Sequence, residues 1–144
     1  MHLKRVVMEN FKSFGGRIEI PLERGFTAIT GPNGSGKSNT GDAIQFVLGP
    51  KSSKSLRADQ STDLIFDGGA HGKPATSATV SLIFSNPVEG NGRRRLGINA
   101  DEVIFTRSVR IGKRGKGISS YEFNGRPSTL TEIRRVLASA GVQA

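Results

Sequence analysis

Cysteine is absent from the 144 residues, and the two histidines, His2 and His71, stand far apart in the sequence. A chain without cysteine forms neither a disulfide framework nor a thiolate metal site. Two isolated histidines supply no cluster of metal ligands either. The composition therefore excludes a disulfide scaffold, and it is what we expect of a protein in a reducing cytoplasm.

Long apolar runs are also missing. No window of the sequence approaches the roughly 18 consecutive apolar residues that indicate a membrane span. The charged start, Met1 to Arg5, is followed by no apolar stretch of the kind found in a signal peptide. The sequence predicts neither a membrane span nor a signal peptide.

Acidic residues are scarce: 12 Asp and Glu stand against 21 Lys and Arg, which leaves a net charge of +9. Such a surface attracts polyanions, for example nucleic acid, nucleotides or acidic lipid. The alternative is the generally basic surface of a basic proteome or a thermophile. We expect a polyanionic partner.

Glycine, in contrast, is abundant at 19 residues, and the hydrophobic fraction is only 35%. The length is typical of a single domain, so one loop-rich domain is expected. Apolar residues predict strands over residues 3–8, 17–22 and 118–123, and alternation of apolar and polar residues predicts strands over 78–84 and 102–110. Short apolar runs predict two further strands, at 25–30 and 64–66. The strands at 102–110 and 118–123 form a hairpin with a basic tip, and Asn124-Gly125 makes a further tight turn.

Two helices are expected. The first follows from Ser38, carries its apolar residues on one face and ends at Gly49-Pro50. The second runs from about Leu130 to Ala140 and is closed by a glycine. Thr129 and Glu132 fit a capping box at its start, in which each side chain satisfies a free backbone donor.

Residues Gly31 to Ser38 match the G-x-x-x-x-G-K-[ST] phosphate-loop pattern in full, between a predicted strand and a predicted helix. Its glycines let backbone N–H groups surround phosphate oxygens, and the helix N-terminus adds partial positive charge. Lys37 neutralises the outer phosphates, and the Ser38 hydroxyl is placed to bind magnesium. The pattern predicts nucleoside triphosphate binding, a property that kinases, GTPases, transporters and DNA-handling ATPases share.

Residues 93–126 hold nine basic and three acidic residues, a surplus of +6 out of the total of +9. Basic side chains on a glycine-rich hairpin can follow a phosphate backbone without reading its sequence. We expect non-specific contacts with double-stranded DNA, made by Arg107, Arg110, Lys113, Arg114 and Lys116. The alternative is that this run is only a solvated face.

Several blocks then identify a family. They are Phe11-Lys-Ser-Phe14, Gly31 to Asn39, Asp42-Ala-Ile44, Phe46-Val-Leu-Gly49, Ser55-Leu-Arg-Ala58, Asp63-Leu-Ile-Phe66 and Phe123-Asn-Gly125. In this order they resemble the N-terminal head segment of the structural maintenance of chromosomes (SMC) family over essentially the whole chain. Gln45-Phe46 and Arg57-Ala58 look more like archaeal members, and Thr40 departs from the usual aliphatic residue.

The resemblance implies ATP and Mg²⁺ as cofactors. It places adenine and ribose near Lys12 and Ser13, for which an exposed polar turn is the alternative reading. It gives Arg57, together with Lys37, a catalytic role at the triphosphate, where a guanidinium can stabilise developing charge. The implied nucleotide-binding residues are Lys12, Ser13, Gly31, Pro32, Asn33, Gly34, Ser35, Gly36, Lys37, Ser38 and Asn39.

The resemblance also implies an architecture: an α/β, ABC-type P-loop ATPase head, of which residues 1–144 are the N-terminal half. This lobe combines a mixed or antiparallel β-rich edge with the P-loop helix. The C-terminal lobe, with its signature motif, Walker B aspartate and catalytic glutamate, as well as the coiled coil and hinge, lies outside the sequence. We therefore expect ATPase activity in the full-length protein and none in this segment alone.

The expected partners are double-stranded DNA, the C-terminal head lobe of the same chain, a second head in a homodimer, and a kleisin-type accessory subunit. The expected role is chromosome condensation and segregation at the nucleoid. Two alternatives stay open. One is a related repair or transport P-loop ATPase, although repair members usually carry Thr-Thr where this chain has Ser38-Asn39. The other is a nucleic-acid-binding module whose glycine loop is inert.

Overall fold

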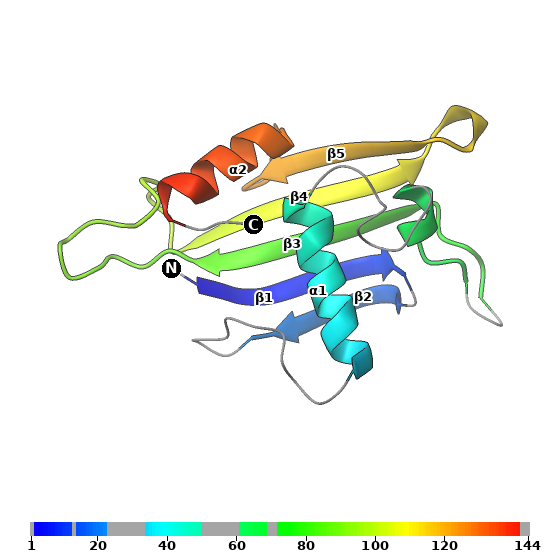
Figure 1. The fold of residues 1–144 in the computed structure, drawn as a ribbon, viewed down its shortest axis with the longest axis horizontal. Coiled ribbons are helices and arrows are strands. Elements are labelled where there is room, and N and C mark those ends of the chain that lie inside the picture. The colour runs from blue at the N-terminus through cyan, green and yellow to red at the C-terminus, as the bar shows by residue number, and fades with distance from the viewer. Residues whose placement is uncertain (1, 13, 23–33, 50–60, 69–71, 142–144) are drawn as a thin grey trace.

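The computed structural model describes residues 2–12, 14–22, 34–49, 61–68 and 72–141. They form one six-stranded sheet in the order β2-β1-β3-β4-β5-β6, in which every neighbouring pair is antiparallel. Two helices, α1 and α2, lie over one face of this sheet (Figure 1). Neither of them is long and apolar enough to cross a membrane.

The strands are β1 His2–Phe11, β2 Phe14–Pro21, β3 Ser77–Ser85, β4 Glu102–Ile111, β5 Gly117–Phe123 and β6 Arg126–Ser128. The helices are α1 Gly34–Leu48 and α2 Leu130–Ser139, with short 3-10 turns at η2 Ser61–Leu64 and η3 Lys113–Gly115. The strands predicted at 3–8, 17–22, 78–84, 102–110 and 118–123 are confirmed, and so are both helices. The strand predicted at 25–30 lies outside the described residues.

The strand predicted at 64–66 is wrong. Leu64 ends the η2 turn, and only Ile65 forms an isolated bridge, to Phe11 at the end of β1. Leu64 and Ile65 are buried in the core, although this single bridge does not extend into a strand. A three-residue apolar run thus reflects side-chain burial here, which periodicity alone does not separate from a strand.

The buried face of the sheet follows from alternation that is regular along most of β4 and covers parts of β1 and β3. Its fully buried side chains include Val6, Met8, Val80, Leu82, Val103 and Phe105. Against them pack Ala43, Phe46 and Val47 from α1 and Leu130, Ile133 and Leu137 from α2. Full burial of one such side chain stabilises the fold by about 1.5–3 kcal/mol before entropy is counted. This packing fixes both helices on the sheet.

The opposite face of the sheet mixes polar pairs with a few apolar side chains, among them Val7, Ile83 and Ile104. Thr79 bonds Ser108 (3.0 Å) and Ser81 bonds Thr106 (2.8 Å) across β3 and β4. An antiparallel sheet that is packed on one face and wet on the other shows this apolar-in, polar-out alternation. The described residues place both helices on the apolar side.

The local signals for the C-terminal helix are largely confirmed. The backbone N–H of Glu132 donates to the Thr129 hydroxyl oxygen (3.1 Å), as the capping box predicts. The Glu132 carboxylate differs from the expected box, because it accepts a hydrogen bond from the Ser128 hydroxyl (3.1 Å). Before this helix, Asn124 (φ 48°) and Gly125 (φ 80°) are both left-handed, as a two-residue hairpin turn of type I′ requires.

Candidate nucleotide-binding site and basic hairpin

The second half of the phosphate-loop motif forms the start of α1. Gly34, Ser35, Gly36, Lys37, Ser38 and Asn39 lie in its first turns, and none of the first-turn residues is acidic. A helix begins with backbone N–H groups that have no partner within the helix, so its N-terminus favours an anion. The helix begins four residues earlier than the predicted start at Ser38, and the phosphate cradle itself stays a prediction. Gly31, Pro32, Asn33, Ser13 and Arg57 lie outside the described residues, so their roles stay predictions.

Lys12 is held beside α1. It follows β1 directly with a left-handed backbone (φ 56°), and its N–H donates to the Leu64 carbonyl (2.7 Å). Its ammonium forms an ion pair with the carboxylate of Asp42, four residues beyond Ser38 on the helix. Four residues are about one helical turn. The predicted nucleotide neighbour therefore lies next to the phosphate-loop helix, although no local pattern in the sequence indicated Asp42 as its partner.

Arg107 contradicts its predicted role as a DNA contact. Only 2% of this residue is exposed, so it offers no surface to a phosphate backbone. Its guanidinium carbon lies 4.3 Å from the centroid of the Phe46 ring and 5.4 Å from that of Tyr121. Nη1 donates to the Phe46 carbonyl (2.9 Å) and Nη2 to the Ser119 hydroxyl (2.9 Å).

The reason is the alternation of β4, in which Arg107 points inward with Phe105 and Val109. That signal was present in the sequence and could have separated Arg107 from the outward-facing arginines. Burial lowers the pKa of the Arg107 guanidinium and raises the pKa of the Tyr121 phenol. An arginine starts so far above neutrality that Arg107 keeps its charge, and Tyr121 stays neutral, at physiological pH.

Two guanidinium groups bind carbonyls in the last turn of α1. Arg107 reaches Phe46, and Nε of Arg134 on α2 donates to the Leu48 carbonyl (3.1 Å). A third arginine, Arg95, donates from Nε to the Ala140 carbonyl at the end of α2 (2.9 Å). Cations at helix C-termini satisfy free carbonyls and complement the helix dipole. Part of the positive charge predicted to bind DNA therefore caps helices.

The tip of the β4–β5 hairpin keeps the other predicted cations in solvent. Arg110, Lys113, Arg114 and Lys116 are exposed, and no ion pair within the described residues involves any of them. The turn is closed by the Gly112 N–H, which donates to the Lys116 carbonyl (2.7 Å). It lies at the end of the sheet where β4 and β5 meet (Figure 1). With respect to the part of the chain that the structure describes, this tip can meet a polyanion without first breaking an ion pair.

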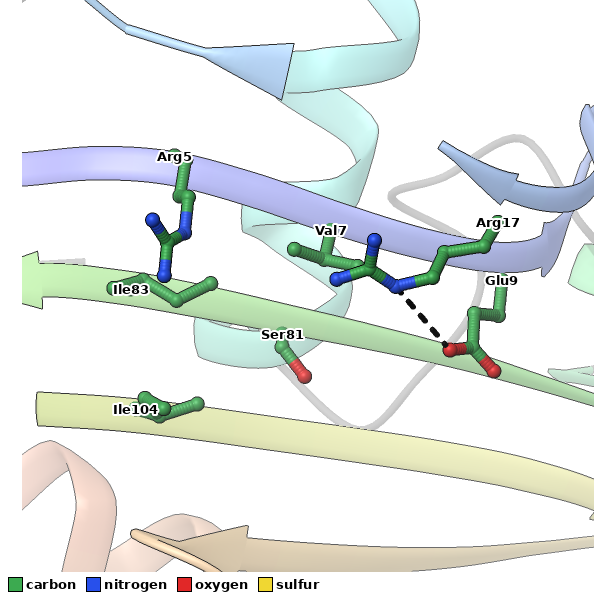
Figure 2. Close-up of a pocket in the computed structure, with 7 residues that line it drawn as sticks. All are labelled: Arg5, Val7, Glu9, Arg17, Ser81, Ile83 and Ile104. Atoms are coloured by element: carbon green, nitrogen blue, oxygen red, sulfur yellow. Dashed lines mark ion pairs between the residues drawn. The ribbon is translucent and has the colours of Figure 1, made fainter. Parts of the chain in front are cut away.

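The open face of the sheet carries a shallow hollow of about 230 Å³. Figure 2 shows its lining by Arg5, Val7, Glu9, Arg17, Ser81, Ile83 and Ile104, with α1 behind the sheet. Both of its arginines are already engaged, Arg17 with Glu9 (3.9 Å) and Arg5 with Glu19 (3.3 Å). The hollow is separated from the start of α1 by the sheet, so it is not part of the phosphate site.

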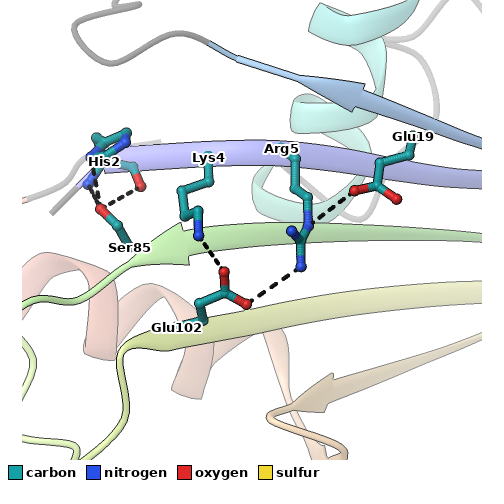
Figure 3. A network of polar contacts seen from close by, with 6 residues as sticks. All are labelled: His2, Lys4, Arg5, Glu19, Ser85 and Glu102. Carbon is teal, nitrogen blue, oxygen red and sulfur yellow. Dashed lines mark hydrogen bonds and ion pairs between the residues drawn. The ribbon is translucent and has the colours of Figure 1, made fainter.

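A polar network beside this hollow joins three strands (Figure 3). Glu102 on β4 pairs with both Lys4 and Arg5 of β1, the second at 3.4 Å, and Arg5 continues to Glu19 on β2. Two consecutive residues reach one carboxylate because the strand register shifts between Leu3 and Arg5. The hydrogen bond from Lys4 lowers the pKa of the Glu102 carboxyl. This network is structural, since its charges are satisfied internally.

The model of the RecF/RecN/SMC N-terminal domain matches residues 2–144. The chain is 44% identical to the chromosome partition protein Smc of Fusobacterium nucleatum over 142 residues, and 44% identical to that of Pyrococcus furiosus over 140 residues. These matches cover 99% and 96% of this chain, but in each case only 11% of the relative.

Solved structures agree with the sequence relatives. A structure from a study of ATP-driven dimerization and DNA-stimulated activation of SMC ATPases matches with a TM-score of 0.83 and 42% identity, over 99% of this chain and 81% of the other. An Smc head bound to the C-terminal winged-helix domain of ScpA matches with a TM-score of 0.81 and 42% identity, over 99% of this chain and 41% of the other. The expected fold, an N-terminal lobe of an ABC-type head, is confirmed.

Proposed function

Because the chain belongs to the RecF/RecN/SMC N-terminal domain family, we propose that it is the ATP-binding N-terminal segment of an SMC ATPase that acts in chromosome partition. The observation that supports this most is the complete phosphate-loop motif at the start of α1, in a lobe that matches an SMC head with a TM-score of 0.83. The segment spans about a tenth of its curated relatives, so the activity of the whole protein is part of the proposal.

In this proposal the chain binds ATP through Gly31 to Asn39. Backbone N–H groups surround the phosphate oxygens, and Lys37 neutralises the outer phosphates. Arg57 stabilises charge that develops during hydrolysis, while Lys12 and Ser13 lie near the adenine and ribose.

Magnesium fits the donors present, with Ser38 as the ligand from this chain. The described residues hold no group of three acidic, histidine or cysteine side chains that could bind a metal by themselves. A magnesium ion at an NTPase site takes most of its ligands from phosphates and water, so a single hydroxyl is a suitable protein contribution. The ion supplies positive charge at the outer phosphates when it is bound.

Hydrolysis needs parts that lie outside this sequence. The proposal assigns the general base and the signature motif to the C-terminal lobe and to a second head, which engage when ATP is bound. A related structure concerns ATP-driven dimerization, and another contains ScpA. By analogy, we include a head dimer, a kleisin-type subunit and a nucleoid-associated location in the proposed function.

DNA contact is assigned to the hairpin tip. Arg110, Lys113, Arg114 and Lys116 are exposed on a glycine-rich turn, which suits non-specific binding to duplex phosphates. The alternative, a merely solvated face, differs in its salt dependence, because only bound cations release counterions from DNA.

The test of the proposed function is the Lys37→Ala variant of the full-length protein. Removal of the main cation at the outer phosphates should weaken ATP binding at least about tenfold, measured by titration calorimetry. The matched control is Lys73→Ala, which removes an exposed lysine outside the motif. Equal ATP affinity of Lys37→Ala and the parent, with both proteins folded, would contradict the phosphate-loop assignment.

A further inference from the structure

The phosphate-loop helix α1 is held at its C-terminal end by the β4–β5 hairpin. We propose that Arg107 is a positioning residue for the nucleotide site, which couples DNA contact at the hairpin tip to the placement of α1. The inference rests on the proposed function, because it assumes that α1 binds ATP and that the tip binds DNA.

The first step is the contact set of the Arg107 guanidinium. One nitrogen bonds the Phe46 carbonyl of α1 and another bonds the Ser119 hydroxyl of β5, each at 2.9 Å. Since Arg107 itself belongs to β4, this one group joins both strands of the hairpin to the helix. The guanidinium also contacts the rings of Phe46 and Tyr121, which restrict its movement.

The second step is the position of the contact within the hairpin. Arg107 lies opposite Tyr121, and Ser119 lies opposite Val109, in the β4–β5 register. The basic tip begins at Arg110 and ends at Lys116, three residues from Arg107 and from Ser119 respectively. A force on the tip that slides β5 past β4 would change the distance between Arg107 on β4 and Ser119 on β5. A movement of the tip would therefore change the hydrogen bond between Arg107 and Ser119.

Further contacts join the Arg107 end of α1 to the part of the helix that is nearer the phosphate loop. The Phe46 ring packs against Phe11, with ring centroids 5.2 Å apart. Phe11 is followed by Lys12, which pairs with Asp42 on the same helix. The helix is thus held toward its C-terminus by Arg107 and toward its phosphate loop by Lys12. A shift of α1 along its axis would disturb both contacts together.

This arrangement predicts reciprocal coupling. If DNA at the tip changes the affinity for ATP, ATP must change the affinity for DNA by the same factor. A lysine at position 107 could not replace the arginine, because it lacks the planar fork that reaches two partners between two rings.

The experiment uses the full-length protein and measures ATP affinity with and without a short duplex DNA. Arg107→Met gives a side chain of similar volume without the charge and without the bonds to Phe46 and Ser119. Because the Phe46 carbonyl loses this donor, unfolding of the variant is measured in parallel and ATP is titrated where the variant remains folded. Ser119→Ala removes only the bond between Arg107 and β5. The matched control is Ser120→Ala, the next residue of β5, whose side chain faces away from Arg107.

We expect DNA to change the ATP affinity of the parent and of Ser120→Ala by about fivefold or more, the lower range of coupling between sites. In Ser119→Ala and Arg107→Met this DNA effect should be lost. Arg107→Met should also bind ATP more weakly without DNA at a temperature at which it is fully folded. A purely structural role would instead lower the ATP affinity only where the melting temperature falls.

If DNA changes the ATP affinity of Ser119→Ala as much as that of the parent, the inference is overturned. This result is decisive even if Arg107→Met does not fold. Absence of any DNA effect in a parent that binds both ATP and DNA would overturn it as well, while leaving the proposed function in place. A parent that binds no ATP would contradict the proposed function itself.

Discussion

Arg107 and Arg110 lie three residues apart on β4 and meet opposite environments. Arg107 points into the core, where it contacts two aromatic rings, whereas Arg110 is exposed at the base of the basic tip. Arg95 and Arg134 differ again, because each donates to a carbonyl at the end of a helix. The net charge of a segment therefore does not measure its affinity for DNA, since the position of each arginine in its element decides its role.

Glu102 gives a test of residue-scale electrostatics. Its pKa is lowered in the folded protein, chiefly by the hydrogen bond from Lys4, so its charged form stabilises the fold. This contribution is present above the unfolded pKa of about 4.3 and is lost as the pH falls through the lower folded value. Because both side chains keep about a third of their surface exposed, the contribution is at most about 1 kcal/mol.

The expected outcome is that Glu102→Gln lowers the free energy of unfolding at pH 7 by a few tenths of a kcal/mol to about 1 kcal/mol. The difference from the parent should shrink below about pH 4, measured by urea denaturation over a pH series. Glu122→Gln is the control, because Glu122 is exposed on the same sheet and forms no ion pair within the described residues. A difference that persists unchanged at pH 3 would show that the ion pair is not its cause.

At the scale of elements, α2 depends on its N-cap. The Thr129 hydroxyl accepts the backbone N–H of Glu132, one of the four donors that a helix start leaves free. Thr129→Ala should destabilise the protein by about 1 kcal/mol in thermal or urea unfolding. Thr131→Ala, at an exposed position in the first turn of the helix, should be neutral or slightly stabilising because alanine favours helix. Equal effects of the two changes would argue against the cap.

The hairpin tip gives the second test at this scale. Replacing Lys113, Arg114 and Lys116 by alanine in the full-length protein should weaken duplex binding and lower the slope of log K against log salt by about 0.9 per lost phosphate contact. Binding should stay indifferent to DNA sequence. The charge-matched control replaces Lys73, Arg93 and Arg126, three exposed cations outside the tip. An unchanged slope in the tip variant would identify the tip as a solvated face.

The sequence predicted these elements where the signal was local. Apolar patterning predicted five of the strands correctly. An N-cap, a terminating glycine and a type I′ turn predicted α2 and the turn before it. It failed where the interaction is non-local: the pairing of Lys12 with Asp42 joins residues 30 positions apart, and Arg134 reaches Leu48 across 86. The DNA contact predicted for Arg107 is wrong for a different reason. The prediction followed the charge of the side chain, although the alternation of β4 already placed it on the inward face.

At the scale of the whole molecule, the described sheet has helices on one face only, and β2 and β6 stand at its two edges. β6 is short and pairs only with Tyr121 to Phe123, so the first half of β5 has no neighbour on that side among the described residues. Unpaired edges favour association with another chain unless a further segment covers them. The proposed C-terminal lobe is such a segment, and it would also supply the acidic groups for hydrolysis.

The two lobes are proposed to carry different parts of the ATPase site, which makes each of them incomplete alone. Residues 1–144 expressed alone should be marginally stable or prone to aggregation, bind ATP weakly and hydrolyse none. Co-expression with the C-terminal lobe of the same protein should raise the melting temperature and the ATPase rate together, since a partner that binds only the folded state stabilises it. The measurement is steady-state ATPase activity of each piece alone and of the pair, with Lys37→Ala as the control for contaminating activity. Sustained turnover by residues 1–144 alone, abolished by Lys37→Ala, would place the general base within this segment and contradict the proposed division.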